Sequence, residues 1–242
     1  MAAAPGKDAA SRQVQRTRDP RLYFYDTIAE SFDQVANPYD LQRRLEVVFD
    51  ELLGDQDLRG KRVLDVGCGT GWFSQRAMAR GASVVSLDIG ERLLHEVRSK
   101  CQSSLVAGDA CHLPLASDSF DFVVACECIE HTLDPRAAVR EVHRVTRPGG
   151  RYVVTVPNRL YQLSTSVAEA FKLRPYFGYE HWLGWFEMRR LVRGLPASIE
   201  TMIGFHLLPP LLRQTWPMLR RIDRFGRLLG PVMWNIAVRA RK

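Results

Sequence analysis

Apolar residues follow two spacings along the middle of the chain. Short runs rich in valine, leucine and phenylalanine predict strands, and between them apolar residues recur every three or four positions, as on the buried face of a helix. The strands are predicted over residues 62–66, 84–87, 105–107, 120–125 and 152–156, and the helices over residues 71–80, 91–100 and 135–145. Strands that alternate with helices are typical of a parallel sheet with helices on both faces. We therefore predict a doubly wound α/β fold.

The regions on either side of this alternation are less regular. Helical spacing predicts helices over residues 23–35 and 39–53, separated at Asn37-Pro38. Residues 158–186 are rich in aromatic side chains and are expected to cover one end of the sheet. Two further strands are predicted, over residues 198–205 and 232–239. Together with the five above, they make a seven-stranded sheet.

Composition changes this picture little. The 242 residues are 46% hydrophobic and 25% charged, which excludes collagen-like and low-complexity proteins. The five cysteines lack the paired C-x-x-C spacing of structural zinc sites, so we expect reduced thiols in a cytoplasmic protein. They are Cys68, Cys101, Cys111, Cys126 and Cys128. The beginning of the chain has no apolar run typical of a signal peptide, and no stretch is long and apolar enough to span a bilayer.

The net charge of +7 is unevenly distributed. Residues 1–146 contain 18 Lys and Arg against 22 Asp and Glu, whereas residues 147–242 contain 16 against 5. Such a basic segment favours an anionic partner, which would be a phosphorylated substrate, a nucleic acid or an anionic membrane surface. A solvated arginine-rich surface explains the same composition equally well.

A glycine loop is the strongest chemical signal. The stretch VLDVGCGTG (63–71) predicts a buried strand that runs into a tight turn and then a helix. Its glycines are spaced G-x-G-x-G, unlike the G-x-G-x-x-G of dinucleotide sites, and Asp65 lies within the strand. A carboxylate repels a pyrophosphate, whereas a ligand with an amino group and a sulfonium favours one. The loop therefore predicts a nucleoside cofactor without phosphates.

Two more aspartates follow predicted strands. Asp88 lies about where an acidic residue accepts hydrogen bonds from a ribose diol, and Asp109 could hold an adenine amino group. Alone, each is more often a helix cap or a turn residue. Together with Asp65, they place carboxylates at the ends of successive strands, and so in one crevice.

With these motifs the sequence resembles the class I S-adenosylmethionine-dependent methyltransferases, closely over residues 21–160 and loosely beyond. The matching stretches are VLDVGCGTG (63–71), VVSLDIG (84–90), GDA (108–110), FDFVVACECIEH (120–131) and RPGG (147–150). Within that superfamily it is most similar to the group of the ubiquinone-biosynthesis O-methyltransferases, through NPYDL (37–41), CECIEHTLDP (126–135) and TVPNR (155–159).

The resemblance implies a Rossmann-like methyltransferase fold, with S-adenosylmethionine as the cofactor. Asp88 would bind the ribose hydroxyls and Asp109 the adenine edge. The implied cofactor-binding residues are Asp65, Gly67, Cys68, Gly69, Asp88, Ile89, Asp109, Ala110 and Cys126. We expect a flexible leader and one methyltransferase domain, divided as follows: leader 1–20, domain 21–242, with N-terminal helices at 21–55, a cofactor-binding core at 60–157, and a substrate cover with the last strands at 158–242.

Two carboxylates and an imidazole lie close together in CECIEH (126–131), where a substrate would meet the methyl group. In one interpretation His131 removes a proton from a hydroxyl while Glu130 or Glu127 orients its ring. In a second, Glu127, Glu130, His131 and Asn158 bind a divalent metal ion that acidifies a bound phenol or catechol. In a third, Glu127 positions the methionine end of the cofactor, and Glu130 and His131 only cap the loop. The sequence leaves all three open.

The C-terminal third offers substrate contacts. Tyr179, His181 and Trp182 lie in the aromatic cover and could bind a flat acceptor. Residues 207–229 combine large apolar side chains with five arginines, which is typical of a basic amphipathic helix at an anionic membrane surface. A helix that packs its apolar face on the sheet edge explains the same pattern. The sequence does not favour a nucleic acid partner, because no recognition pattern accompanies the charge.

We therefore predict an S-adenosylmethionine-dependent methyltransferase that acts on a small or lipid-like acceptor, with O-methylation of a hydroxyl as the favoured reaction. The protein is expected in the cytoplasm, with peripheral membrane contact if the basic helix binds lipid. C- or N-methylation on the same scaffold is one alternative. A catalytically silent adenosylmethionine-binding partner protein is another.

Overall fold

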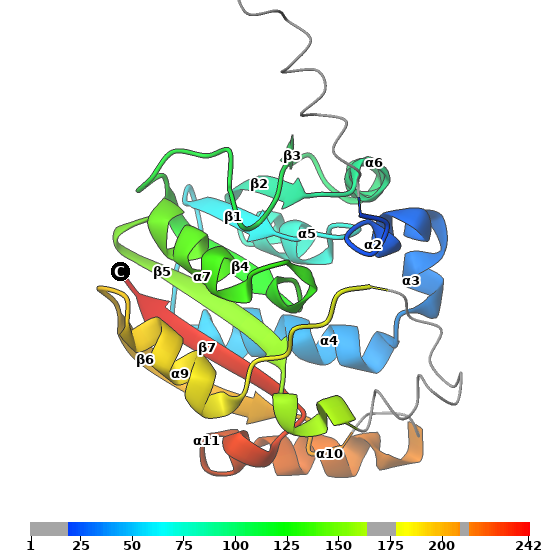
Figure 1. Cartoon of the computed structure of the whole chain (residues 1–242), viewed down its shortest axis with the longest axis vertical. Coiled ribbons are helices and arrows are strands. Elements are labelled where there is room, and N and C mark those ends of the chain that lie inside the picture. The colour runs from blue at the N-terminus through cyan, green and yellow to red at the C-terminus, as the bar shows by residue number, and fades with distance from the viewer. Residues whose placement is uncertain (1–18, 164–177, 209–212) are drawn as a thin grey trace, which may run out of the picture.

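The computed structural model describes residues 19–163, 178–208 and 213–242. Their strands form one seven-stranded sheet in the order β3-β2-β1-β4-β5-β7-β6 (Figure 1). The strands are β1 (Arg62–Val66), β2 (Ser83–Asp88), β3 (Ser104–Ala107), β4 (Phe120–Cys126), β5 (Thr146–Pro157), β6 (Ser198–Phe205) and β7 (Asn235–Arg241). Neighbours are parallel except β7, which is antiparallel to both β5 and β6. The predicted doubly wound, mostly parallel α/β fold is confirmed.

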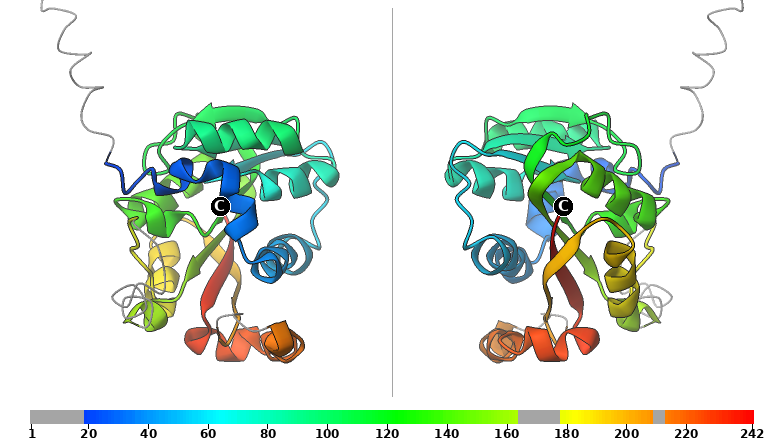
Figure 2. Two further views of the ribbon diagram at one scale, coloured as in Figure 1. Left: turned by 90° about the vertical axis from the view of Figure 1, so that its right-hand side faces the viewer. Right: turned by 90° about the vertical axis from the view of Figure 1, so that its left-hand side faces the viewer.

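Helices cover both faces of this sheet, as the side views show (Figure 2). One face packs against α4 (Pro38–Glu46), its π-helical continuation Val47–Leu52, and α5 (Trp72–Ala79). The other face packs against α7 (Pro135–Val145) and α9 (Trp185–Arg193). The remaining α-helices are α2 (Phe24–Thr27), α3 (Phe32–Val35), α6 (Glu91–Lys100), α10 (Trp216–Asp223) and α11 (Gly226–Leu229). Because both faces are covered, β1 and β4 are buried along most of their length.

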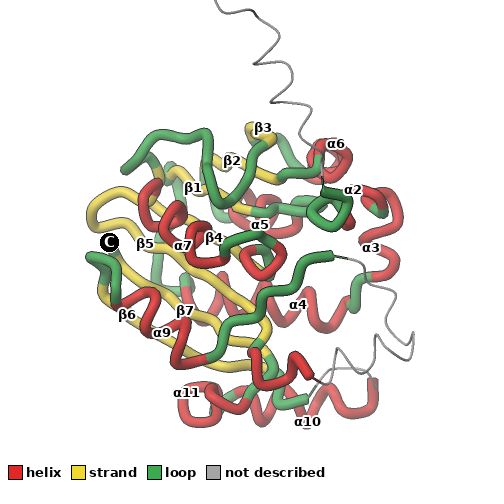
Figure 3. Tube along the Cα trace, viewed as in Figure 1, coloured by secondary structure: helices red, strands yellow, loops and turns green. Residues whose placement is uncertain are grey.

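The helix predicted over residues 23–35 is not continuous, which corrects the expectation from its spacing. It is divided into α2, a 3₁₀ turn (Ala29–Ser31) and α3, which stand at one end of the sheet (Figure 3). Its acidic side chains bind other elements. Asp26 Oδ1 accepts hydrogen bonds from the backbone N–H groups of Arg92 and Leu93, at 2.8 and 3.3 Å, and so caps the start of α6.

Two strand boundaries also differ from the prediction. β7 begins at Asn235, and not at Val232, because Gly230–Val232 forms a 3₁₀ turn. β5 begins at Thr146, earlier than predicted, where Thr146 pairs with Phe120 before an irregularity in the ladder. Of the predicted leader 1–20, only the last two residues are among those described, and 164–177 of the aromatic cover lie outside them.

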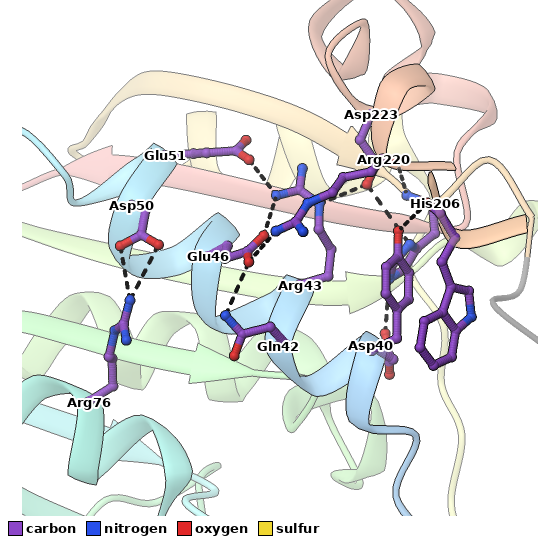
Figure 4. A network of polar contacts seen from close by, with 12 residues as sticks. Asp40, Gln42, Arg43, Glu46, Asp50, Glu51, Arg76, His206, Arg220 and Asp223 are labelled. Carbon is purple, nitrogen blue, oxygen red and sulfur yellow. Dashed lines mark hydrogen bonds and ion pairs between the residues drawn. The ribbon is translucent and has the colours of Figure 1, made fainter. Parts of the chain in front are cut away.

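A buried ion pair connects α4, which precedes the sheet in sequence, to α10, which follows β6 (Figure 4). The Nε of Arg43 on α4 donates to Asp223 Oδ2 on α10 at 2.8 Å, and the backbone N–H of His206 donates to Asp223 Oδ1 at 2.7 Å. All three residues are buried. The N-terminal helix and the segment after β6 are therefore fixed to each other by one carboxylate.

Replacement of that carboxylate should destabilise the fold strongly. Asp223→Ala leaves the Arg43 guanidinium and the His206 N–H without this partner in a buried position, and we expect a loss of about 3–5 kcal/mol in the free energy of unfolding. Urea denaturation measures it. Asp55→Ala is the control, because Asp55 is exposed and its pair with Arg239 should contribute about 0–1 kcal/mol. Equal losses in the two variants would contradict this account of the pair.

Candidate active site

A cavity of about 320 Å³ opens where the loop after β1 meets the carboxyl ends of β2 and β4. Its size is within the usual range for small-molecule sites, about 300–1,000 Å³. The glycine loop, the N-terminal segment with α2 and α3, the turn after β4 and part of the aromatic cover all contribute to its walls. This is the edge at which open α/β sheets bind their ligands.

Gly67 and Gly69 of the loop have a positive φ, and Gly67 also lies against the Cys128 side chain. Gly67 has a φ of 66°, and a Cβ there would overlap the Cys128 side chain. Gly69 has a φ of 51°, but a Cβ there would meet no atom within 4 Å. Gly67 therefore lets the turn after β4 pack against the loop, whereas Gly69 keeps the side of the loop that faces open space free of a side chain.

The backbone N–H groups of this loop are already used within the protein. Those of Gly67 and Cys68 donate to the carbonyl of Leu87, at 2.7 and 3.0 Å. That of Gly69 donates to Asp88 Oδ2 at 2.9 Å. A phosphate-binding loop needs such groups free to face the anion. The geometry is thus consistent with a cofactor that carries no phosphate.

Asp88 and Asp109 both line the cavity. Asp88 is buried and accepts from the N–H groups of Gly69 and Gly90, both at 2.9 Å, and burial raises the pKa of its carboxyl. Each oxygen of a carboxylate has a second lone pair, so the ribose hydroxyls can still be bound. Asp109 accepts from the N–H of Cys111 at 2.8 Å, while its side chain stays partly exposed.

The structure places Asp65 away from the cavity wall, contrary to its predicted direct contact with the cofactor. Its Oδ2 accepts from the hydroxyl of Ser74 on α5 at 2.7 Å, and Ser74 in turn bonds Ser86 at 2.6 Å. Burial raises the pKa of Asp65 to about 7. Side chains alternate between the faces of a strand, and that of Asp65 bonds α5 beneath the loop. The other eight predicted cofactor residues line the cavity.

The N-terminal segment forms part of the cavity wall and contacts the end of the glycine loop. Sequence reasoning did not identify this contact. Asp33 accepts from the hydroxyl of Thr70 at 2.6 Å and from the indole N–H of Trp72 at 2.9 Å, and it pairs with Lys100 at 2.7 Å. These residues are far from Asp33 in sequence. No local signal marks an acidic residue in an amphipathic stretch as the partner of a distant glycine loop.

The ring of His131 is oriented by a backbone carbonyl. Its Nδ1 lies 2.8 Å from the Tyr179 carbonyl oxygen, which can only accept, so Nδ1 carries the proton and Nε2 carries a lone pair in the neutral ring. Nε2 lies 3.5 Å from the Tyr25 hydroxyl and 3.8 Å from Glu130 Oε1. The predicted orientation of this ring by Glu130 or Glu127 is therefore replaced by one from the cover segment.

Glu130 is a buried carboxyl at the same wall. It is 1% exposed, and its Oε2 has no hydrogen-bond partner among the described residues. Burial, with the nearby charge of Glu127, raises the pKa of Glu130 well above its usual value. A neutral carboxyl of this kind can donate a hydrogen bond to a ligand.

Glu127, in contrast, is fully engaged within the protein. Its Oε1 accepts from the Thr155 hydroxyl and its Oε2 from the Asn235 side-chain amide, both at 2.8 Å. The Arg44 guanidinium lies 3.6 Å from Oε2. Burial raises the pKa of Glu127, and Arg44 partly offsets this. Sequence reasoning missed Arg44, Thr155 and Asn235, whose spacing from the CECIEH motif carries no signal.

The structure gives no support to the predicted metal site at Glu127, Glu130, His131 and Asn158. In residues 19–163, 178–208 and 213–242, no three His, Cys, Asp or Glu side chains are grouped to hold an ion. Asn158 is absent from the cavity wall and donates its amide to the carbonyls of Pro231 and Met233 at 3.0 and 2.9 Å. These bonds hold Asn158 in the core, away from the imidazole.

Of the three predicted substrate residues, only Trp182 lines the cavity. It is buried, and its indole N–H has no partner among the described residues. His181 is exposed, and its ring bonds the Thr132 carbonyl at 2.9 Å. The hydroxyl of Tyr179 bonds Asp19 at 2.7 Å and also contacts Arg21. Tyr179 thus contributes to the site through its carbonyl group, which orients His131.

Comparison with known proteins agrees with this geometry. Residues 64–154 match the family model described as a methyltransferase domain. The chain contains a class I S-adenosylmethionine-dependent methyltransferase domain. This domain covers the glycine loop, Asp88, Asp109 and the turn with His131. The family match therefore supports the cofactor class that the sequence motifs imply.

Two curated relatives show how much of the chain is alike in sequence. A malonyl-[acyl-carrier protein] O-methyltransferase of Erwinia pyrifoliae is 36% identical over 135 residues, 54% of this chain and 52% of that protein. A ubiquinone biosynthesis O-methyltransferase of Pseudomonas aeruginosa is 39% identical over 108 residues, 42% and 47% of the two chains. The chain thus spans about half the length of the curated relatives it matches.

Solved structures extend the likeness of fold beyond the methyltransferase domain. The magnesium protoporphyrin IX methyltransferase of Synechocystis, solved with bound S-adenosylhomocysteine, aligns with a TM-score of 0.65 at 18% identity and covers 92% of this chain and 98% of its own. A methyltransferase of Mesorhizobium loti aligns with a TM-score of 0.63 at 21% identity, over 84% and 100% of the two chains. At these identities the likeness shows the fold alone.

Removal of the Asp88 carboxylate should weaken S-adenosylmethionine binding. Asp88→Ala loses the acceptor for the ribose and the bond that fixes Gly69, and we expect a loss of about 1–3 kcal/mol of binding free energy by calorimetric titration. Asp65→Asn is the matched control, because Asp65 is absent from the cavity wall and asparagine can still accept from Ser74. An equal loss in the control would return Asp65 to the cofactor site.

The raised pKa of Asp65 predicts that the stability of the protein depends on pH, and Asp65→Asn tests this prediction. The pKa of Asp65 is about 7 in the folded protein against a usual 3.8, so the stability that its neutral form contributes is lost as the pH rises toward 7. Asp65→Asn lacks this loss. Relative to wild type, its free energy of unfolding should improve by about 2–3 kcal/mol between pH 5 and pH 8. Urea denaturation at both values measures it, and a constant difference would contradict the assignment.

Proposed function

We propose that this protein transfers a methyl group from S-adenosylmethionine to a hydroxyl group of a small or lipid-like acceptor. The observation that carries the proposal is the position of His131. Because its Nδ1 donates to Tyr179, the lone pair that can accept a proton is on Nε2, and His131 lines the same cavity as the glycine loop and Asp88. A base beside a cofactor site is what O-methylation of a neutral hydroxyl requires.

S-adenosylmethionine supplies an activated methyl group on its sulfonium, so the protein mainly aligns the reactants and accepts a proton. In the proposed step the O–H bond of the acceptor breaks and its proton moves to Nε2 of His131. The oxygen forms a bond to the methyl carbon as the bond from that carbon to sulfur breaks. S-adenosylhomocysteine and a methyl ether or ester leave, and His131 loses its proton to solvent.

Glu130 and Trp182 are proposed to hold the acceptor in place. Both line the cavity, both are buried, and each has a polar atom without a partner among the described residues. A neutral Glu130 donates a hydrogen bond without adding a charge, and the Trp182 indole N–H is a second donor. These two donors favour an acceptor that has a further oxygen near the hydroxyl group.

The cavity wall also includes large apolar side chains, among them Leu22, Phe32, Pro157 and Trp234. Such a wall favours an aromatic or prenyl-like body over a sugar or a phosphate. The two relatives above that are named O-methyltransferases are consistent with transfer to oxygen. We further propose a cytoplasmic location, because the five cysteines are unpaired. No helix among the described residues is long and apolar enough to cross a bilayer.

Two measurements test the function. Calorimetric titration should show binding of S-adenosylmethionine and none of NADH, because the N–H groups of the loop are not free for a pyrophosphate. The protein is then incubated with methyl-labelled S-adenosylmethionine and catechol, or with a prenylated catechol, and the position of the label is determined. Label on carbon or nitrogen would overturn O-methylation, and binding of NADH alone would overturn the cofactor assignment.

His131→Gln should lower kcat by about 10²–10⁴-fold while the affinity for S-adenosylmethionine is retained, because only the proton transfer is lost. The remaining rate should rise with pH as the acceptor hydroxyl ionises by itself. His181→Gln is the matched control, since His181 is exposed and absent from the cavity wall. Steady-state rates from pH 6 to pH 10 measure both variants. An unchanged kcat in His131→Gln would mean that another group takes the proton.

A further inference from the structure

Helices α10 and α11 have two unlike sides. On the inner side, Leu219 and Asp223 are buried, and a Cβ at Gly226 would overlap the carbonyl of Gly204 on β6. The inner side therefore packs against β6, at the edge of the sheet, as one of the two interpretations of the sequence pattern predicted. The helices are thus fixed in place without the use of their outer side.

The outer side exposes large apolar side chains that this packing leaves out. Met218 is 49% exposed, Phe225 58% and Leu228 77%. Leu208 and Val232, near the two ends of this region, are 52% and 46% exposed. The amphipathic helix predicted within residues 207–229 is divided in the structure into α10 and α11. Leu219 is buried and Phe225 is exposed, because the chain turns between the two helices.

Exposed arginines lie among these apolar side chains. Arg221, Arg224 and Arg227 are exposed, and none forms an ion pair with a described residue. Arg220 differs, since it pairs with Glu46 on α4. Between residues 213 and 232 the one acidic residue is Asp223, which is buried against Arg43. Arg221, Arg224 and Arg227 also line a hollow with Glu46 and Glu51, and five arginines stand against three carboxylates there, so the surface keeps a net positive charge.

We propose that this surface docks on an anionic lipid bilayer. This surface, the α10–α11 face, consists of Met218, Arg221, Arg224, Phe225, Arg227 and Leu228. Charge complementarity selects the occupant: the arginines match anionic headgroups, while the apolar side chains match the acyl boundary just below them. A free phosphate would satisfy the arginines but leave Phe225 and Leu228 in water. A nucleic acid would do the same.

Helices α10 and α11 lie together at the end of the molecule opposite β2 and β3 (Figure 2). Trp234 lines the cavity and packs on the ring of Tyr161, at 4.8 Å between centroids. The Tyr161 hydroxyl donates to the carbonyls of Leu207 and Val232, which flank the helices in sequence. The docked protein would thus place this wall of the cavity close to the lipid. Docking itself does not depend on the proposed methyl transfer.

Co-sedimentation with lipid vesicles tests the proposal on the full chain. Vesicles of phosphatidylcholine alone are compared with vesicles of equal parts phosphatidylcholine and phosphatidylglycerol, at low and high salt. The protein should sediment with the anionic vesicles at low salt, and added salt should weaken the binding. Arg221→Gln/Arg224→Gln/Arg227→Gln should lower the partition coefficient by roughly 100-fold, and Phe225→Ser/Leu228→Ser by at least about tenfold.

Matched controls come from other surfaces of the protein. Phe186→Ser removes an aromatic side chain that is 69% exposed on α9, and Arg59→Gln removes an arginine whose side chain is 80% exposed. Both should sediment like wild type. Calorimetric titration with S-adenosylmethionine on each sample checks that the variants are folded. If the wild-type protein does not bind S-adenosylmethionine, the cofactor assignment is wrong, whatever the result with vesicles.

Three results would overturn the proposal. The first is no sedimentation with anionic vesicles at low salt, and the second is equal binding to neutral vesicles. The third is sedimentation of the α10–α11 variants at wild-type level. Displacement of the bound protein by inorganic phosphate at low millimolar concentration would mean that the arginines form a phosphate site. Displacement by a short RNA, but not by phosphate, would indicate a nucleic acid surface.

Discussion

Burial of carboxylates beside an apolar cavity is the constraint on which much of this structure depends. Glu127 is held at the cavity wall, where an uncompensated negative charge would be costly. The compensation comes from a chain of alternating charges and polar groups that runs from the cavity to the far end of the molecule. Its members are Glu127, Arg44, Asp40, His206, Asp223 and Arg43, of which Figure 4 shows the last four. Because each group satisfies the next, the chain requires α4, the end of β6 and α10 to be in place together.

This requirement explains why α4 is part of the active site although it precedes the sheet in sequence. Arg44 faces the cavity from α4, and Arg43 on the adjacent position faces the C-terminal segment. Tyr39 adds a stacked contact with Trp216, at 4.6 Å between ring centroids, and Arg220 binds Glu46. One helix therefore transmits the position of α10 to the cavity wall through neighbouring side chains.

The sequence predicted those features that follow from local backbone demands. The alternation of strands and helices, and the glycine loop with Asp88, arise from short-range pattern, since Gly67 is required by a tight turn and β1 by a buried run. Asp65 was misplaced because its motif position does not show which side of the strand its carboxyl faces. Asn158 was chosen as a cavity residue where Asn235 binds Glu127, and the antiparallel pairing that brings β7 there is a long-range property. The contacts of Asp33 with Thr70, Trp72 and Lys100 were not predicted for the same reason, because they too join residues distant in sequence.

The contacts of Tyr179 make the orientation of the His131 ring depend on distant parts of the chain. The Tyr179 carbonyl orients His131, while the Tyr179 hydroxyl is held by Asp19 and Arg21, which precede α2. Neither Asp19 nor Arg21 lines the cavity. A substitution at either position would therefore act on the imidazole indirectly, through the backbone of Tyr179, although it is remote in sequence from the ring that it turns.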